Sequence, residues 1–422
     1  MRKKFNLKNI KLTKVKGIFK WLYPGIGIKR WIGLSAFGII LVILGAISLR
    51  TEEYWFVQIL DAIVVGSGII ILILGIKRMV HSFIMAVIPS SKGAELVDIL
   101  YQKKQLSIGP KIVAVGGGHG LSAVLHGLKE YTNNINAIVT VADSGGSTGR
   151  LREQFDIPAP GDIRNCLVAL ADAEPLMQEL FQFRFKKDSE LSGHSFGNLF
   201  ITAMTQITGD FETAIKESSK VLAIRGSVIP STVDKVNLVA EYRDGSFMEG
   251  EAKIPEQKLF IKRVSLKPSY PIPTEEAIKA IREAQVIVLG PGSLYTSIIP
   301  NLLIKEITDT ILASGAIKIY VCNVMTQSGE TDGYSASDHI KALIHHSHPR
   351  ILDYCILNTG EIPNDILKRY TQEDSYPVVD DTKKIEDMGY RVIEEDVVVT
   401  DDVVRHDPLK LAKIILGLIE EI

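Results

Sequence analysis

Two glycine-rich segments of this chain have the composition of phosphate-binding turns. Each follows a short apolar run: the first is Gly116-Gly117-Gly118-His119-Gly120, and the second begins Gly290-Pro291-Gly292-Ser293. Glycine lets the backbone approach a diphosphate closely, and a helix that begins at such a turn presents free N–H groups. The first segment is not the G-x-G-x-x-G dinucleotide fingerprint, because Leu121 stands where the third glycine belongs, and it is not a P-loop. A nucleotide-binding turn and a strand–helix turn without ligand both remain open.

A third segment, residues 143–152, combines an acid, three hydroxyl groups and two arginines. Arginine can bind a phosphate through two parallel hydrogen bonds. Asp143 can accept a hydrogen bond from a ribose hydroxyl or hold Mg²⁺. The candidate ligand-binding residues of this segment are Asp143, Ser144, Gly145, Gly146, Ser147, Thr148 and Arg150.

Two further segments each open a predicted helix. Residues 160–165 place Asp162 at the start of one helix, followed by Arg164 and Asn165 in its first turn. Residues 193–199 place His194 and Asn198 at the start of another, where the amide of Asn198 suits the edge of a base. The alternatives without a ligand are helix capping by Asp162 and a packing turn at 193–199.

Polar side chains also follow two later apolar runs, 286–289 and 317–322. The segment after the first run contains Gly290, Gly292, Ser293 and Tyr295, and the segment after the second contains Asn323, Gln327 and Thr331. Amides and hydroxyls in such numbers at a strand end are hard to explain by packing alone. We therefore expect these residues to contact the same ligand.

Several other chemistries are not supported by the sequence. His345, His346 and His348 lack the spacing of a zinc helix, and no G-x-S-x-G or C-x-x-C motif occurs. The three cysteines, Cys166, Cys322 and Cys355, lie in or beside apolar segments and are typical of buried thiols in a reduced compartment. We expect no catalytic nucleophile–base pair.

Short apolar runs that alternate with helical segments predict an α/β domain over residues 91–422. The predicted strands are 112–115, 135–141, 286–289, 317–322 and 354–357, with helices at 94–105 and 121–128 among others. This pattern indicates a Rossmann-like, doubly wound and mostly parallel sheet with helices on both faces. Residues 236–242 and 247–254 predict an inserted β-hairpin around Arg243-Asp244-Gly245-Ser246. Ligands of such sheets bind beyond the carboxyl ends of the strands, where the candidate residues occur.

Residues 1–90 predict a basic N-terminus followed by an all-α membrane hairpin. Residues 31–49 carry no charge, and Asp61 is the one charged residue of 57–76, so each stretch is long enough to span a bilayer. Asp61 is expected to be solvated near the outer interface. The cations before and after the hairpin predict two spans of the inner (cytoplasmic) membrane, with both termini and the main domain in the cytoplasm. Helices of a soluble core are the alternative.

Charge is distributed unevenly along the chain. The net charge is −1, but residues 1–30 hold ten Lys or Arg and no acid, so residues 31–422 sum to −11. The basic segment can lie on anionic membrane lipid. The acidic remainder argues against nucleic-acid binding.

Taken together, the motifs resemble the YvcK/CofD family, in particular its YvcK-like gluconeogenesis-factor branch, over roughly residues 110–415. The resemblance implies a Rossmann-like fold that binds UDP-N-acetylglucosamine or UDP-glucose, and a role in cell shape and envelope precursor control on gluconeogenic carbon sources. It places the binding residues in the segments above and adds Tyr334 and Arg369 for the sugar or diphosphate. In the transferase branch, which makes a deazaflavin coenzyme, an aromatic-containing segment stands where this chain has Gly145–Gly149.

Two functions follow as expectations. The first is a membrane-tethered UDP-sugar-binding regulator that needs no cofactor, acts on a regulatory protein partner and forms a homo-oligomer. The second is a phospholactate-transferase-like enzyme, in which Asp143 or Asp162 holds Mg²⁺ and Arg150 or Arg164 neutralises the transferred group. A nicotinamide oxidoreductase is disfavoured because the third fingerprint glycine is missing.

Overall fold

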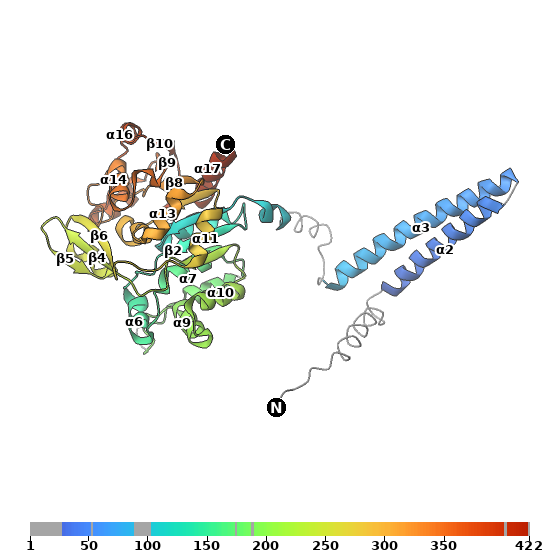
Figure 1. Cartoon of the computed structure of the whole chain (residues 1–422), viewed down its shortest axis with the longest axis horizontal. Helices are drawn as coiled ribbons and strands as arrows, with labels where there is room; N and C mark the ends of the chain where they lie inside the picture. Colours follow the sequence, from blue (N-terminus) through green and yellow to red (C-terminus); the bar gives the residue numbers. More distant parts are fainter. Residues whose placement is uncertain are drawn as a thin grey trace, which may run out of the picture. The chain divides into compact units, whose positions relative to one another are not determined.

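The computed structural model describes residues 28–51, 54–87, 103–173, 175–186, 190–400 and 403–420. The chain forms two compact units, which divide between Gln102 and Lys103 (Figure 1). The predicted domain boundary between residues 90 and 91 lies outside the described residues. So do the basic segment up to residue 27, part of the connection between the apolar helices, and most of the helix predicted over 94–105.

The N-terminal unit consists of two apolar antiparallel helices, α2 (Ile28–Thr51) and α3 (Trp55–Val87). Small residues bring their backbones together: a Cβ added to Gly38 would lie 2.8 Å from the carbonyl oxygen of Gly68. Gly38 and Gly45 are seven residues apart, as are Gly68 and Gly75, so the close contacts recur along one seam. The outward faces carry exposed leucine, isoleucine and phenylalanine side chains.

Asp61 lies in this seam, so the expectation that it is solvated is wrong. Its exposed fraction is 8%, and its Oδ2 has no hydrogen-bond partner in the described part of the chain. Asp61 precedes Gly68 by seven residues and Gly75 by fourteen. Seven residues are nearly two helical turns, so Asp61 lies on the same face of α3 as these glycines and faces α2. Both helices are apolar enough, over 21 and 28 residues, to cross a membrane, although helices of a soluble core share that property.

The second unit contains one parallel sheet of seven strands, which confirms the α/β fold. The strands are β1 (Ile112–Gly116), β2 (Ile135–Val139), β3 (Ser227–Pro230), β7 (Val286–Leu289), β8 (Ile317–Val321), β9 (Tyr354–Asn358) and β10 (Arg391–Glu395). Their order is β10-β9-β8-β7-β1-β2-β3, and every pairing is parallel. The chain therefore winds outward in one direction from β1 and in the other from β7, so the topological switch point lies between these two strands.

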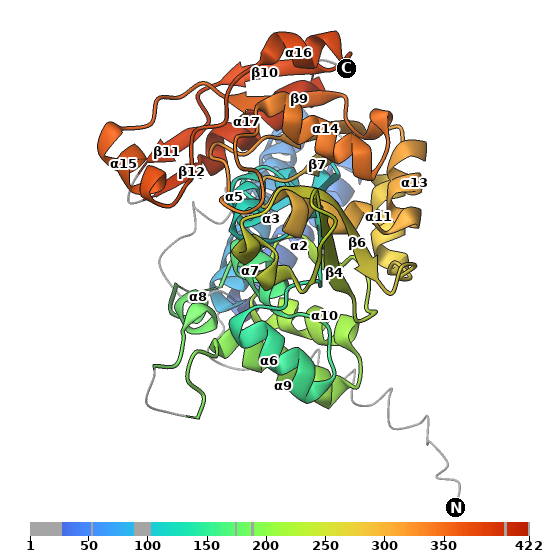
Figure 2. The same ribbon diagram turned by 90° about the vertical axis from the view of Figure 1, so that its left-hand side faces the viewer.

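Helices cover both faces of the sheet, as right-handed crossovers in two directions require. On one face α5 (Gly118–Leu128) packs against α7 (Gly161–Leu170) and α17 (Pro408–Glu420), and on the other α11 (Glu275–Glu283) packs against α13 (Lys305–Ala313). Figure 2 shows α6, α9 and α10 gathered at one end of the unit and α14 and α16 at the other. These and the remaining helices are α6 (Gly146–Phe155), α8 (Pro175–Gln182), α9 (Phe196–Thr208), α10 (Phe211–Val221), α12 (Ile299–Leu302), α14 (Ala336–His346), α15 (Asn364–Gln372) and α16 (Thr382–Asp387).

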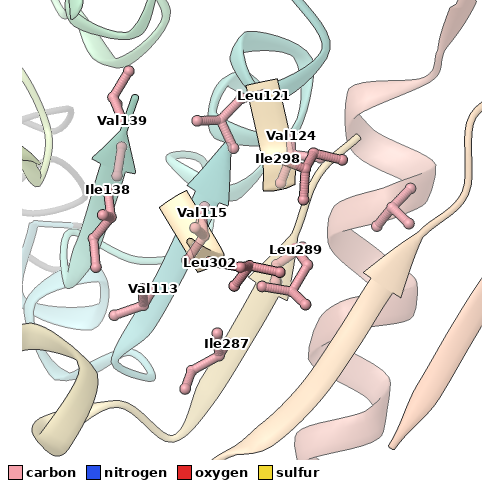
Figure 3. Packing of buried hydrophobic residues seen from close by; sticks show 14 of the residues in the cluster. Val113, Val115, Leu121, Val124, Ile138, Val139, Ile287, Leu289, Ile298 and Leu302 are labelled. Carbon is pink, nitrogen blue, oxygen red and sulfur yellow. The ribbon is translucent and has the colours of Figure 1, made fainter. Parts of the chain in front are cut away.

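The core lies between the central strands and these helices. The apolar side chains of β1 and β7 are fully buried, because both faces of the strands are covered. Figure 3 shows these side chains beside those of α5 and of the segment after β7. All belong to one buried cluster, which includes Val113, Val115, Leu121, Val124, Ile287, Leu289, Ile298 and Leu302. This packing fixes the carboxyl ends of β1 and β7, where both glycine turns begin.

The inserted hairpin differs from the prediction in two respects. The strands are β4 (Asn237–Tyr242) and β5 (Phe247–Glu249), and a third strand, β6 (Ile261–Lys267), pairs with β4. The second strand stops at Glu249 rather than continuing to Ile254, because Gly250 has φ 109° and starts a 3₁₀ turn, η1 (Glu251–Lys253). A two-stranded ribbon of β11 (Val398–Thr400) and β12 (Val404–His406) completes the unit.

We expect the full chain to stay with membranes at about 1 M salt, because salt screens the basic segment but does not weaken hydrophobic insertion. Residues 91–422 should instead be soluble and folded, because the second unit contains the whole sheet. Sedimentation of membranes after a salt wash measures the first, and circular dichroism of the shorter chain measures the second. Release of the full chain by salt, or aggregation of the shorter chain, would contradict the proposed tether.

Candidate functional site

A cleft of about 560 Å³ lies at the carboxyl ends of the strands, at the switch point between β1 and β7. Its walls come from the segments after β1, β2, β7 and β8, as the predicted parallel sheet requires. Among the predicted residues it is lined by Gly117, Gly118, His119, Gly120, Asp143, Gly145, Gly146, Ser147, Thr148, Asp162, Arg164, Asn165, Asn198, Gly292, Ser293, Asn323 and Gln327.

The other predicted residues lie outside the lining. Several support the residues that do line it: Thr331 accepts a hydrogen bond from the Gln327 backbone, and Tyr295 pairs with Tyr334 through their hydroxyls at 2.7 Å beneath the second glycine turn. Arg150 points to the Ser192 carbonyl, and Arg369 is exposed on α15. The remaining residues in this group are Gly116, Ser144, His194 and Gly290.

The two glycine turns pack against each other at backbone distance. A Cβ on Gly120 would lie 2.6 Å from the carbonyl oxygen of Pro291 and 2.9 Å from Cα of Gly292. A Cβ on Gly117 would collide with the carboxylate of Asp162. The N-terminus of α5 thus faces the cleft with its first N–H groups, beside a second turn that continues into a π-helical turn, η3 (Leu294–Ile298).

Arg164 supplies a buried positive charge at this cleft. Its exposed fraction is 6%, and its guanidinium donates to Ser195 Oγ at 2.6 Å, Asn198 Oδ1 at 3.1 Å and Asn165 Oδ1 at 2.6 Å. None of these acceptors is charged, Nε has no partner, and Arg164 forms no ion pair among the described residues. Asp162, two residues earlier on α7, and Asp143 attract Arg164 without a direct ion pair. A buried guanidinium that touches no carboxylate suits an anionic ligand.

More positive charge faces His119. Partial burial lowers the pKa of His119, and the charges of Arg164, Arg405 and Arg184 lower it further, so the three arginines share one region of the cleft. Arg184 and Arg405 line the cleft and were not among the predicted residues. Neither forms an ion pair in the described ranges.

Three carboxylates face the other part of the cleft: Asp143, Asp162 and Glu251. Desolvation, followed by the charge of Asp143, raises the pKa of Asp162 to about 7 and holds the pKa of Glu251 well above its usual range. Glu251 comes from η1 of the insertion and accepts from the backbone N–H of Ser144 at 3.5 Å. In the described part of the chain no three acidic, histidine or cysteine side chains are placed to chelate a metal by themselves.

Polar groups beneath the second turn are incompletely paired. Gln327 donates through Nε2 to Ser293 Oγ at 2.8 Å, while its Oε1 has no partner within the described residues. Glu330 accepts from Thr296 at 3.1 Å and leaves Oε2 unpaired, and burial raises its pKa to about 7. Of these two residues only Gln327 lines the cleft, and its free acceptor suits a ligand that offers N–H or O–H groups.

Ser147 and His194 form a pair that the sequence did not suggest. Ser147 Oγ lies 3.0 Å from Nδ1 of His194, and Asn198 Nδ2 lies 3.3 Å from the same oxygen. Asn198 accepts from Arg164 through its other end. The pair therefore belongs to one hydrogen-bond network that fixes the orientation of Arg164, and it holds the start of α6 in place.

Sequence reasoning missed the residues that distant elements bring to the cleft. Glu251 comes from the insertion, and Tyr370, Val404, Arg405 and His406 come from α15 and β12. The glycine at 250, which ends a strand just before an acid, is the signal that could have found Glu251. Arg184 was missed as well. The remaining lining residues lie within the predicted segments 160–165, 290–297 and 323–331: Gly161, Pro291, Thr296, Ser297, Val324 and Met325.

Comparison with known proteins gives concordant matches. The family model described as 2-phospho-L-lactate transferase CofD matches residues 112–398. A putative gluconeogenesis factor of Nostoc sp. is 47% identical, with 96% of this chain and 93% of the relative covered. The gluconeogenesis factor of Bacillus subtilis is 50% identical over 74% of this chain and 99% of its own length. A crystal structure of a UPF0052 family protein from Bacillus halodurans superposes with TM-score 0.71 at 48% identity, covering 73% and 99% of the two chains.

Replacing Gly120 with alanine should loosen the contact between the two turns, because the added methyl group meets backbone atoms that cannot rotate away. Strain of this kind costs about 1–3 kcal/mol. Urea unfolding of residues 91–422 measures it. Gly315→Ala is the matched control, since nothing lies within 4 Å of its added Cβ. Equal unfolding midpoints for the two variants would contradict the close packing.

Proposed function

The chain belongs to the CofD/YvcK family, and we propose that it is a membrane-tethered regulatory protein that binds a UDP-sugar, UDP-N-acetylglucosamine or UDP-glucose. The relatives named gluconeogenesis factor support a role in carbon metabolism. In this proposal ligand binding, without turnover or a required cofactor, links carbon supply to cell shape and envelope precursors through a regulatory protein partner.

The observation that carries the proposal is that the buried guanidinium of Arg164 has no direct ion pair among the described residues. A diphosphate would supply a direct counterion and would also meet N–H groups at the start of α5 beyond that of Gly118, which bonds to Asp162. Arg184 and Arg405 extend the positive region on the exposed side of the cleft. Two phosphates with one negative charge each match this arrangement better than a single carboxylate would.

The two ends of the cleft suit the two ends of a nucleotide sugar. Val324, Met325, Tyr370 and Val404 form an apolar wall on which a base can lie. Asp143, Asp162 and Glu251 offer acceptors for the hydroxyl groups of a ribose or a sugar. The tether in this proposal is the α2–α3 pair, which would keep the protein at the cytoplasmic membrane, where envelope precursors are used.

Isothermal titration of residues 91–422 with UDP-N-acetylglucosamine, UDP-glucose and UDP tests the proposal. Saturable binding of one of the sugars is the expected result. Absence of heat with all three at millimolar ligand would remove the proposed function. GDP-glucose is the matched control for UDP-glucose, because it keeps the diphosphate and the sugar but changes the base.

Arg164→Met should weaken UDP-sugar binding by about 10- to 100-fold, because a charge-assisted contact is worth about 1.5–3 kcal/mol. The isosteric stem keeps the packing of α7 intact. Arg282→Met, an exposed site on α11, is the control and should bind normally. Unchanged affinity of Arg164→Met, with a normal melting temperature, would show that the diphosphate lies elsewhere.

The carboxylates favour a second candidate function, Mg²⁺-dependent transfer of a phosphate-linked group. The matching family model is described as a 2-phospho-L-lactate transferase. Mg²⁺ is commonly held by one or two carboxylates together with substrate phosphates, so Asp143 and Asp162 fit it even without a third protein ligand. When bound, the metal would neutralise charge on the diphosphate. Incubation with Mg²⁺ and a panel of nucleotides, read by mass spectrometry, would reveal a product, and an unchanged panel would count against transfer.

The pH dependence of binding separates the two functions. In EDTA, affinity for a UDP-sugar should fall from about pH 6 to about pH 9, because Asp162, with a pKa of about 7, and Glu251, with its pKa raised, are neutral at the lower pH and repel the diphosphate once ionised. With Mg²⁺ as a true ligand, affinity should rise with pH instead. Glu251→Gln should flatten the upper part of the EDTA profile, and Glu256→Gln, an exposed neighbour, should not. A flat profile for the unsubstituted chain would contradict the charge assignment.

A further inference from the structure

One edge of the seven-stranded sheet is open to a further strand. β10 is the outermost strand, next to α16 in Figure 2, and pairs with β9. A groove of about 790 Å³ runs beside it, lined in part by β10 and by α17. Proteins usually block such edges with proline, lysine or a bulge. β10 has none of these, whereas the opposite edge strand, β3, ends in Pro230.

Two residues of β10 direct their backbone N–H and C=O groups away from β9, towards the open edge. Arg391 donates its N–H to the carbonyl of Asp353, and the carbonyl of Glu395 accepts from the N–H of Thr359. Alternate residues of a strand face the same neighbour, so Val392 and Glu394 present their N–H and C=O groups to the outer edge. The edge therefore offers two donors and two acceptors in line.

The sequence of β10 is complementary to itself when reversed. Consider an antiparallel pair of β10 strands centred on Ile393. Val392 then lies opposite Glu394 of the second copy, and these are the two residues whose backbone N–H and C=O groups face outward. The same register places Arg391 opposite Glu395 at both ends. These positions are non-hydrogen-bonded pairs, in which side chains approach most closely. Hydrogen bonding and charge thus select the same register.

Both charges are available for this pairing. Arg391 and Glu395 are exposed, and neither forms an ion pair in the part of the chain that the structure describes. Arg391 is also held in place, since Nη1 donates to Tyr354 Oη at 2.7 Å and the guanidinium lies 5.4 Å from the centre of the Tyr354 ring. An oriented arginine loses little freedom when it meets a carboxylate.

We propose that two copies of this chain associate edge to edge through antiparallel β10 strands, so that their sheets join across a two-fold axis. Such an interface is closed, because each copy uses the same strand and no open edge remains at β10. The proposal does not depend on the ligand of the cleft.

Cross-linking tests the register. Ile393→Cys places two thiols opposite each other across the axis, at about 4.5 Å between Cα atoms, which a disulfide can bridge. With the full chain in detergent and copper phenanthroline as oxidant, we expect a dimer on a non-reducing gel that dithiothreitol removes. The native cysteines Cys166, Cys322 and Cys355 are buried, so the unsubstituted chain should not cross-link. Arg391→Cys is the matched control, because its two copies would lie about 13 Å apart along the strands.

Charge exchange tests the pairing. Arg391→Glu and Glu395→Arg should each raise the dimer dissociation constant at least about tenfold in sedimentation experiments, because each sets like charges opposite each other twice. The double variant should restore the dimer, while Lys279→Glu, at the other edge of the sheet, should change nothing. The proposal would be overturned if the unsubstituted chain were monomeric. It would also be overturned if the double variant did not regain the original dissociation constant, or if none of these substitutions changed that constant. Sedimentation and cross-linking need no ligand, so they test the dimer whether or not the chain binds a UDP-sugar. If it does bind one, Arg391→Glu should bind it normally.

Discussion

The cleft depends on the backbone contact between two glycine turns at the switch point of the sheet. Buried β-branched and leucine side chains fix β1 and β7 side by side, and Gly120 then meets Pro291 and Gly292 with no side chain between them. Because of this contact, the start of α5 and the π-helical turn after β7 open on one space. A side chain at Gly120 would separate the two turns before any ligand entered.

Charges of both signs line this space, and Asp162 and Arg164, two residues apart on α7, attract each other without a direct ion pair. Arg164 is buried with neutral partners and is held by the Asn198–Ser147–His194 network, while Asp143, Asp162 and Glu251 repel one another on the acidic side. A diphosphate would pair with Arg164, whereas the carboxylates call for protons, hydroxyl donors or Mg²⁺ beside it. For this reason the same cleft fits a sensor and a metal-assisted transferase.

The sequence predicted the parts of the site that follow a strand directly. The turns at 116–120, 143–148 and 290–293 are found at strand ends because short continuous apolar runs and glycine mark them locally. The short edge strands β3 and β10 were missed, since Ser227–Pro230 and Arg391–Glu395 are too short or too polar to show that pattern. Glu251, Tyr370 and Arg405 were missed for a different reason: tertiary packing brings η1, α15 and β12 to the cleft. Gly250 is a local signal for Glu251, but no spacing in the chain records the approach of Tyr370 and Arg405.

The C-terminal segment joins the open edge to the cleft. From Glu395 the chain passes within two residues to Val397, whose N–H donates to Asn358 at the end of β9, and then forms the ribbon that carries Arg405. His406, beside Arg405, contacts the Cys322 carbonyl at the end of β8 through Nε2 at 3.1 Å. The ribbon is thus anchored to the sheet at both ends by hydrogen bonds to neighbouring strands. The same hydrogen bonds that fix the ribbon to the ends of β8 and β9 therefore hold Arg405 at the wall of the cleft.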